Sequence, residues 1–274
     1  MSPVLLEARA ISLGSPREGG WQAVLAQFDL QLAPGEVVTI LGPSGVGKSS
    51  LLRVLAGLQQ PRSGSVTLHG QPLQGPHPRL AVAFQDPSLL PWLSLEKNVA
   101  FGLDFARQPK LAAAERRARI DHAIAAVGLA HARGQYPAQL SGGMAQRTAL
   151  ARCLARQPEV LLLDEPFGAL DALTRQQLQD ELLAIRERAG ITTLLVTHDA
   201  EEATYLADRV VVLEPRPGRI KSVIEIDLPH PRLRTGVALH GLREKVLHQI
   251  TGDGGYLPLP ARRVEGLRPE LIAL

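Results

Sequence analysis

The chain has 274 residues, enough to bury a substantial hydrophobic core without disulfide or metal support. Hydrophobic residues make up 45% and charged residues 21%, with 25 glycines and 21 prolines, which excludes collagen, coiled-coil and disordered chains. A formal net charge of +3 and an aromatic content of 4% are both too low to indicate a nucleic-acid-binding protein.

The N-terminal residues 1–7 lack the basic stretch and the long apolar stretch of a secretory signal. No later segment approaches the roughly 18 uninterrupted apolar residues that a membrane-spanning helix needs. The single cysteine, Cys153, cannot form an internal disulfide and is typical of a protein from a reducing compartment. We therefore expect a protein that is soluble or attached to a membrane surface.

Apolar runs predict the strands in chain order. Residues 24–32 and 65–68 alternate between apolar and polar side chains, which predicts a small antiparallel sheet on the N-terminal side. Four later runs are short and almost continuously apolar, as in strands buried on both faces of a parallel sheet. They are residues 37–41, 160–163, 192–196 and 210–213. The pattern predicts an α/β fold.

Helical patterns rich in alanine, arginine and leucine dominate between about residues 87 and 157, which predicts a helical subdomain inserted into the chain. Its arginine-rich segment 115–119 is interpreted as a solvated helix face. Residues 237–250 have apolar side chains at helical spacing and predict a packing or capping helix. We expect a main domain over 1–228 and a helical extension or tail over 229–274.

Residues 42–49 match the phosphate-loop pattern G-x-x-x-x-G-K-[ST] and stand between a predicted strand and a predicted helix. Converging backbone N–H groups and the helix N-terminus would bind phosphates, Lys48 would reach the β- and γ-phosphates, and the Ser49 hydroxyl would ligate Mg²⁺. The predicted nucleotide-binding residues here are Gly42, Pro43, Ser44, Gly45, Val46, Gly47, Lys48, Ser49 and Ser50.

Two carboxylates and a histidine follow predicted buried strands. Asp164 and Glu165 end the run 160–163, and His198 follows the run 192–196. The carboxyl ends of parallel strands meet at the edge where ligands bind in open α/β sheets. We expect Asp164 to hold Mg²⁺ through water, Glu165 to act as the general base for an attacking water, and His198 to help position that water at the γ-phosphate.

A second anion-binding pattern occupies residues 140–147, where Ser141, Gly142 and Gly143 lead into a predicted helix. It lies about ninety residues after the phosphate loop, and one side of one nucleotide does not readily accommodate both. A face-to-face dimer would resolve this, with the serine–glycine helix of one copy closing over the nucleotide held by the other.

Together these motifs resemble the nucleotide-binding subunit of ATP-binding cassette (ABC) transporters, in the order typical of that family, over residues 37–213. The resemblance implies a P-loop ATPase core with an N-terminal antiparallel β-subdomain and an inserted α-helical subdomain, using ATP and Mg²⁺. It also implies that Gln85 senses Mg²⁺ and the membrane partner, that Ser141 and Gly143 contact the opposing nucleotide, and that Asp171 couples the two sites across the dimer.

Particular residues resemble the nitrate, sulfonate and taurine importer branch, and most of all the aliphatic sulfonate importers. Met144 stands where the wider family often has glutamine, and residues 89–92 read Leu-Leu-Pro-Trp. The family stacks an aromatic side chain on adenine, and Trp21 is the nearest candidate, with a core or loop tryptophan as the alternative. Prolines break the apolar segment 84–93, so part of it is predicted to be exposed as a docking patch, the alternative being a buried loop.

The resemblance implies partners as well: a second copy of the chain, two membrane-spanning permease subunits docking near Gln85 to Leu93, and, indirectly, a substrate-binding protein. The chain would lie on the cytoplasmic face of the plasma membrane. Nitrate, taurine and a thiamine-pyrimidine precursor stay open beside aliphatic sulfonates as transported solutes. A soluble cassette ATPase acting on DNA or ribosomes and an exporter half are the alternative classes.

Overall fold

A six-stranded sheet forms the centre of the computed structural model, which describes residues 4–17, 20–103, 107–215 and 217–251. The strand order is β10-β9-β3-β8-β7-β6, and all neighbours are parallel except β10 and β9. The strands are β3 (Val37–Leu41), β6 (Leu80–Ala83), β7 (Val160–Asp164), β8 (Thr192–Thr197), β9 (Arg209–Glu214) and β10 (Arg219–Glu225).

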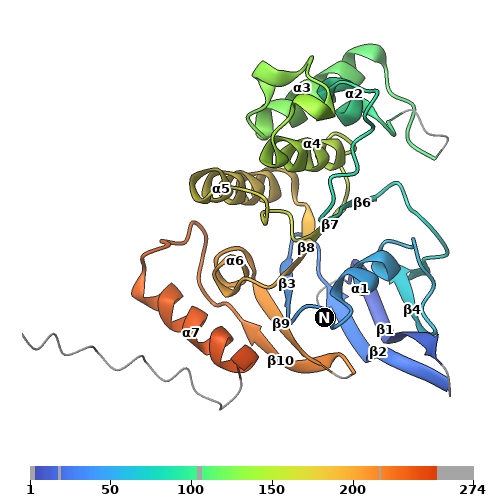
Figure 1. Ribbon diagram of the computed structural model, residues 1–274, viewed down its shortest axis with the longest axis vertical. Coiled ribbons are helices and arrows are strands. Elements are labelled where there is room, and N and C mark those ends of the chain that lie inside the picture. The colour runs from blue at the N-terminus through green and yellow to red at the C-terminus, as the bar shows by residue number, and fades with distance from the viewer. Residues whose placement is uncertain (1–3, 18–19, 104–106, 216, 252–274) are drawn as a thin grey trace, which may run out of the picture.

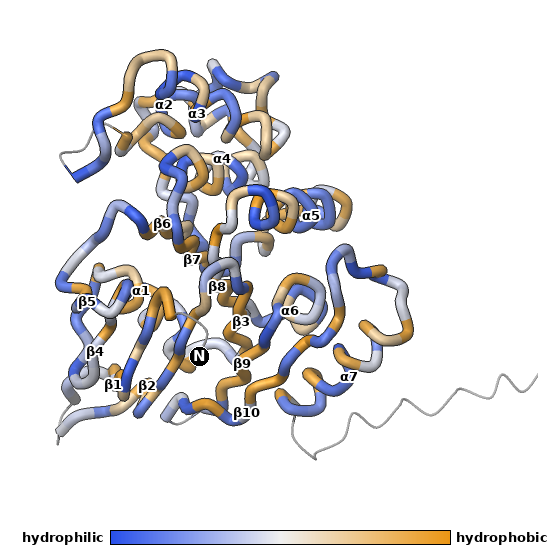
Figure 2. Tube along the Cα trace, turned by 180° about the vertical axis from the view of Figure 1, so that it is seen from behind, coloured by the Kyte–Doolittle hydropathy of each residue, from blue (hydrophilic) through white to orange (hydrophobic). Residues whose placement is uncertain are grey.

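The central strands of this sheet are buried on both faces. Every residue of β3, β7 and β8 is buried, and Figure 2 shows these strands as a hydrophobic band in the middle of the molecule. Such continuous apolar runs can be accommodated only where helices or a second sheet cover both faces. The predicted α/β fold with a buried parallel sheet is confirmed.

A second, antiparallel sheet lies on the N-terminal side in the order β2-β1-β4-β5. Its strands are β1 (Leu6–Arg17), β2 (Gly20–Leu32), β4 (Ser63–Leu68) and β5 (Gln71–Pro72). The sequence predicted the later part of β2 and of β4 but not β1. Register shifts interrupt the pairing of β1 with β2 between Ala8 and Leu13, so the alternation expected of a half-buried strand is broken there.

Helices cover the larger sheet and build a separate layer at one end of the molecule (Figure 1). Those beside the sheet are α1 (Lys48–Leu55), α5 (Ala172–Ala189), α6 (Ala200–Leu206) and α7 (Val237–Thr251). The end layer consists of α2 (Leu95–Ala100), α3 (Ala113–Ala126), α4 (Gly142–Leu154) and the 3₁₀ turns Ala130–Ala132 and Pro137–Gln139. Among the helices of the described residues, none combines the length and apolar character needed to cross a bilayer.

The arginine-rich face of α3 is occupied by ion pairs. Arg117 contacts Glu96 at 3.1 Å and Asp121 at 3.2 Å, and Arg119 pairs with Glu115 one turn earlier. These contacts are those of a solvated helix surface whose charges neutralise one another. The interpretation of residues 115–119 as a solvated face agrees with this geometry.

The segment after β10 is tied to the C-terminal end of α6 by a buried arginine. Arg232 is 6% exposed, and its Nη1 donates to the carbonyl oxygens of Thr204, Tyr205 and Ala207 at 2.7 to 3.0 Å. A guanidinium fits this position because the last carbonyls of a helix lack partners within the helix and carry partial negative charge. The helix α7 then packs against α6 and β9, with Val246 fully buried.

His230, in the same segment, predicts a pH-dependent stability. Neither ring nitrogen has a hydrogen-bond partner, and burial, aided by the charge of Arg232, lowers the pKa of His230 to about 4 against the pull of Asp208. The unfolded chain therefore binds the additional proton between pH 6.5 and 4, so stability falls as the pH drops through that window.

We expect the free energy of unfolding to lose up to about 3 kcal/mol across the window through this residue. Urea denaturation at pH 7 and pH 4.5 measures the loss, and His230→Asn should reduce the difference between the two pH values. An unchanged difference in the variant would contradict the role given to His230.

Candidate active site

The parallel register brings three segments that are distant in sequence to one edge of the sheet. Leu41 at the end of β3 is paired with Thr197 at the end of β8, and Asp164 at the end of β7 is paired with Val196. The phosphate loop follows β3, Glu165 follows Asp164 at the end of β7, and His198 follows β8. The candidate residues therefore lie close together, at the edge of the sheet that the sequence predicted.

The phosphate loop turns tightly between β3 and α1. Gly45 and Gly47 have φ angles of +80° and +100°, which glycine adopts without the steric penalty of a side chain. α1 begins at Lys48, whose side chain is buried and whose Nζ donates to the carbonyl oxygens of Gly42 at 2.8 Å and Pro43 at 3.0 Å. The ammonium group is thereby held within the loop at a helix N-terminus, a site suited to phosphate.

Burial lowers the pKa of Lys48, and the nearby carboxylates of Glu165 and Asp164 oppose that shift. Burial also raises the pKa of Asp164, while a hydrogen bond from the Ser49 side chain lowers it. Desolvation thus weakens the charged form of both groups, and each is partly stabilised by a neighbour. The oxygen atoms of Ser49 and Asp164 are of the donor type that Mg²⁺ prefers.

Glu165 contacts both Gln85 and His198. Its Oε1 lies 3.1 Å from His198 Nδ1, and its Oε2 accepts a hydrogen bond from Gln85 Nε2 at 3.3 Å. The backbone of Glu165 has a φ of +47°, unusual for a residue with a side chain and typical of functional sites, and its N–H donates to Val196 at 2.8 Å. His198 is 63% exposed and Glu165 19%, so the pair is open to an incoming ligand.

A pocket of about 380 Å³ joins these groups. It is lined by Val24, Ser44, Gly45, Gly47, Lys48, Ser49, Ser50, Gln85, Glu165 and His198. All of these residues except Val24 are candidate site residues predicted from the sequence. No motif marks Val24; its place follows from β2 passing beside the phosphate loop, where a Cβ at Gly47 would lie 3.0 Å from its side chain.

The serine–glycine segment lies at the start of α4 and is not among the residues lining this pocket. Ser141 caps α4 by accepting a hydrogen bond from Met144 N at 3.2 Å. Asp171 likewise caps α5, accepting from Thr174 N at 3.0 Å, and this bond lowers the pKa of Asp171. Within one chain, neither Ser141 nor Asp171 is brought to the phosphate loop.

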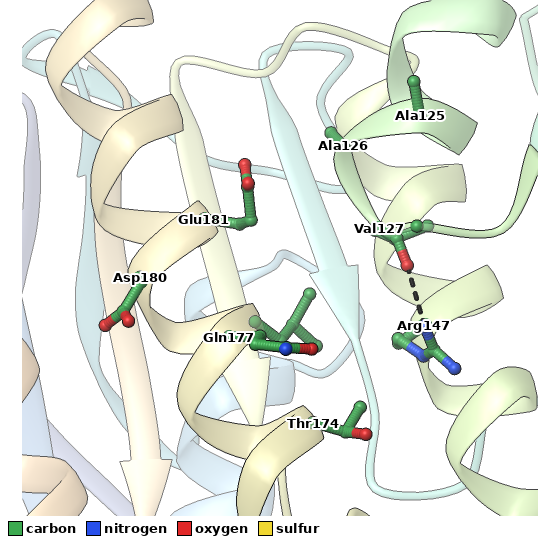
Figure 3. A pocket seen from close by; sticks show the side chains of 10 residues that line it. Ala125, Ala126, Val127, Arg147, Thr174, Gln177, Asp180 and Glu181 are labelled. Atoms are coloured by element: carbon green, nitrogen blue, oxygen red, sulfur yellow. Dashed lines mark hydrogen bonds between the residues drawn. The ribbon is translucent and has the colours of Figure 1, made fainter.

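A second cavity, of about 350 Å³, separates α5 from the end of α3 and from α4. Figure 3 shows Thr174, Gln177 and Glu181 of α5 on one side and Arg147, hydrogen-bonded to the Val127 carbonyl at 3.1 Å, on the other. Arg147 is the last residue of the serine–glycine motif. The cavity thus lies between the helical layer and α5.

Trp21 also lies apart from the site, and its position weakens its assignment to adenine stacking. Trp21 is 37% exposed, the guanidinium of Arg62 lies 4.2 Å from its ring centroid, and a Cβ at Gly14 would lie 2.7 Å from two ring atoms. Trp21 is not among the residues that line the phosphate-loop pocket. Arg62 would have to move before a base could stack on that face.

A sequence model of the family described as "ABC transporter" matches residues 25–168. The chain belongs to this family. It is 50% identical over 230 residues to the aliphatic sulfonates import ATP-binding protein SsuB 1 of Xanthomonas axonopodis pv. citri. The aligned region covers 83% of this chain and 90% of that protein. It is 46% identical over 255 residues to the bicarbonate transport ATP-binding protein CmpC of Synechocystis, covering 91% of this chain but 38% of that protein.

Two solved structures of an ABC cassette with the same fold are dimeric. The chain resembles the dimeric ABC transporter cassette MJ0796 with a TM-score of 0.75 and 28% identity, over 82% of this chain and 100% of that one. A dimeric post-hydrolysis state of the same cassette, bound to ADP and Pi, gives a TM-score of 0.74 and 27% identity. The chain is thus an ABC ATPase domain, and its fold class and family were predicted correctly from the sequence.

Proposed function

We propose that the chain is the ATP-hydrolysing subunit of a membrane importer for aliphatic sulfonates, at the cytoplasmic face of the membrane. The observation that carries the ATPase is the meeting of Lys48, Glu165 and His198 in one pocket at the carboxyl edge of the sheet. The similarity to the SsuB proteins supports the substrate class.

The phosphate loop binds the triphosphate. Backbone N–H groups of residues 44–50 and the N-terminus of α1 face the phosphates, and Lys48 exchanges its contacts to the Gly42 and Pro43 carbonyls for phosphate oxygens. Ser49, Asp164 and Gln85 would hold Mg²⁺, since each offers a hard oxygen donor at this edge. The ion, when bound, neutralises charge on the phosphates.

Glu165 is the general base. Its carboxylate accepts the proton of a water that attacks the γ-phosphate, and Gln85 orients one of its oxygens. His198, 3.1 Å from the other oxygen, donates to the γ-phosphate and so keeps phosphate, water and base in line. The left-handed backbone conformation of Glu165, which is unfavourable for a residue with a side chain, sets the position of its carboxylate beside the attacking water.

Two copies complete the site. Ser141, Gly142 and Gly143 are absent from the pocket lining of their own chain, and the start of α4 offers free N–H groups for an anion. We place them against the nucleotide of the partner copy, with Asp171 coupling the two sites. If Trp21 stacks on adenine, Arg62 leaves its ring on nucleotide binding.

The loop after Gln85 docks on the permease subunits, which in turn receive solute from a substrate-binding protein. The buried amide of Asn98 bonds to Leu90, Leu93 and Ser94 in this loop, and Arg152 donates to the Pro87 and Ser88 carbonyls. A groove of about 560 Å³ opens beside it, and Trp92 stands out from the loop with 69% of its surface exposed. A rigid loop that presents an exposed tryptophan is typical of a docking surface.

Trp92→Ser is expected to weaken the binding of the chain to membranes at least tenfold, because losing an aromatic anchor that is buried at an interface costs about 2 kcal/mol or more. Sedimentation of membranes from cells expressing the whole transporter measures the bound fraction. Leu233→Ser is the matched control, because Leu233 is 77% exposed elsewhere. Equal retention of both variants, with ATP binding intact, would contradict the docking assignment.

Growth of a strain lacking this chain tests the solute. Sulfate, an alkanesulfonate or taurine is supplied as the only sulfur source, with ammonium or nitrate as nitrogen. Failure on alkanesulfonate alone, restored by the gene, is the expected result. Failure on taurine or nitrate would move the assignment to those solutes. Normal growth throughout would remove sulfonate, taurine and nitrate and leave the thiamine-pyrimidine precursor and the bicarbonate named for the CmpC relatives.

A further inference from the structure

Arg175 stands between two segments that belong to the nucleotide site but come from different elements. It lies in the first turn of α5, where its backbone N–H donates to the Asp171 carbonyl at 2.9 Å. Its Nη2 turns back to donate to the Leu170 carbonyl at 3.1 Å. Leu170 in turn packs close to Gly143, since a Cβ there would lie 3.0 Å from its methyl group. The guanidinium is thus anchored to the segment that carries Asp171.

The other side of Arg175 faces the start of α6. Its Nη1 lies 3.9 Å from Asp199 Oδ2, and its Nε lies 3.9 Å from Glu202 Oε1. Thr197 Oγ1 donates to Glu202 Oε2 at 2.8 Å and accepts from Asp199 N at 3.0 Å. Glu202 is therefore linked to the residues on both sides of His198.

Arg175 and Glu202 lie too far apart to form a hydrogen bond. Arg175 Nε is buried without a hydrogen-bond partner, and the Glu202 carboxylate is buried with only 6% of the residue exposed. Burial raises the pKa of Glu202, while Thr197 and the charge of Arg175 lower it. A buried donor and a buried carboxylate 3.9 Å apart both gain from a closer approach, because a charge-assisted hydrogen bond would satisfy each of them.

We propose that Arg175 is a positioning residue for ATP hydrolysis, which closes onto Glu202 when nucleotide is bound and so fixes His198 relative to the segment of Asp171. The closure needs a shift of about 1 Å to reach hydrogen-bond distance. The closure would connect His198, which the proposed function places at the γ-phosphate, with Asp171, which it places at the dimer interface. This inference rests on the proposed function.

Steady-state kinetics of the full chain test it through Arg175→Met, Arg175→Lys and Glu202→Gln. Arg175→Met should lower kcat about tenfold and leave the KM for ATP within about twofold, because it does not touch the phosphate loop. Arg175→Lys keeps the charge and should return kcat to within about threefold of the unsubstituted chain. The kcat of the double variant Arg175→Met, Glu202→Gln should be no lower than that of Arg175→Met alone, because both substitutions remove the same contact.

Arg133→Met is the matched control, because Arg133 also forms a half-buried ion pair, with Asp121, in the helical layer. It should lower the melting temperature without changing kcat. The proposal is overturned if Arg175→Met lowers only the melting temperature, or if the losses in the single variants multiply in the double variant. Should Arg175→Met fail to fold, an unchanged kcat in Glu202→Gln, which removes the charge that Arg175 approaches, overturns it. A lack of turnover in the unsubstituted chain would instead contradict the proposed function, and this inference with it.

Discussion

Lys48→Ala is expected to weaken ATP binding at least a hundredfold, about 2.7 kcal/mol. The buried ammonium of Lys48 is the cation held inside the phosphate loop, and its loss removes charge-assisted hydrogen bonds to two phosphates. The Gly42 and Pro43 carbonyls lose their partner as well, so the loop itself loosens. Isothermal titration calorimetry of the full chain with Mg²⁺ and ATP measures the change.

Lys97→Ala is the control for that experiment, because Lys97 is an exposed lysine on α2, away from the phosphate-loop pocket. It removes the same charge and should leave the affinity unchanged. If Lys48→Ala bound ATP as tightly as Lys97→Ala, the assignment of residues 42–50 to phosphate binding would be wrong.

Glu165→Gln should lower kcat by about 10²- to 10⁴-fold while leaving the affinity for ATP within a few-fold. The amide keeps the size of the carboxylate and can still contact Gln85 and His198, but it cannot accept a proton from water. The effect is therefore expected in the chemical step and not in binding. Phosphate release at saturating ATP, measured beside calorimetry, separates the two.

Glu159→Gln tests whether the loss is specific to the site. Glu159 is an ion-paired carboxylate too, with His69 and Arg79, but it precedes β7 at the opposite end of that strand. Its variant should hydrolyse ATP at the normal rate. A kcat in Glu165→Gln close to that of Glu159→Gln would show that another group accepts the proton.

The parts of the site that the sequence predicted are those where local pattern and fold impose the same constraint. A buried parallel strand needs a continuous apolar run, and the residue after it must lie at the ligand-binding edge, so Asp164, Glu165 and His198 could be placed from their position after such runs. The phosphate loop could be placed because its glycines and Lys48 serve one geometry.

The parts that could not be predicted depend on contacts between segments far apart in sequence. The strand β1 lacks a regular alternation because of its register shifts, and Val24 reaches the pocket only because β2 passes beside the loop. The contacts of Arg175 and Arg232 with α6 could not be predicted, because their partners there lie about 25 residues away along the chain or more. Trp21 was named from the resemblance, and the structure places Arg62 over its ring.

Assembly of two copies around ATP is tested most directly by the mass in solution of the full-length Glu165→Gln chain, measured by light scattering with and without Mg²⁺ and ATP. The phosphate-loop pocket lacks the serine–glycine segment of its own chain, and the proposed function assigns that role to the segment of a second copy. We expect the mass to double when ATP is added, and to stay that of one chain in Lys48→Ala under the same conditions. A chain that binds ATP and remains a monomer would contradict it.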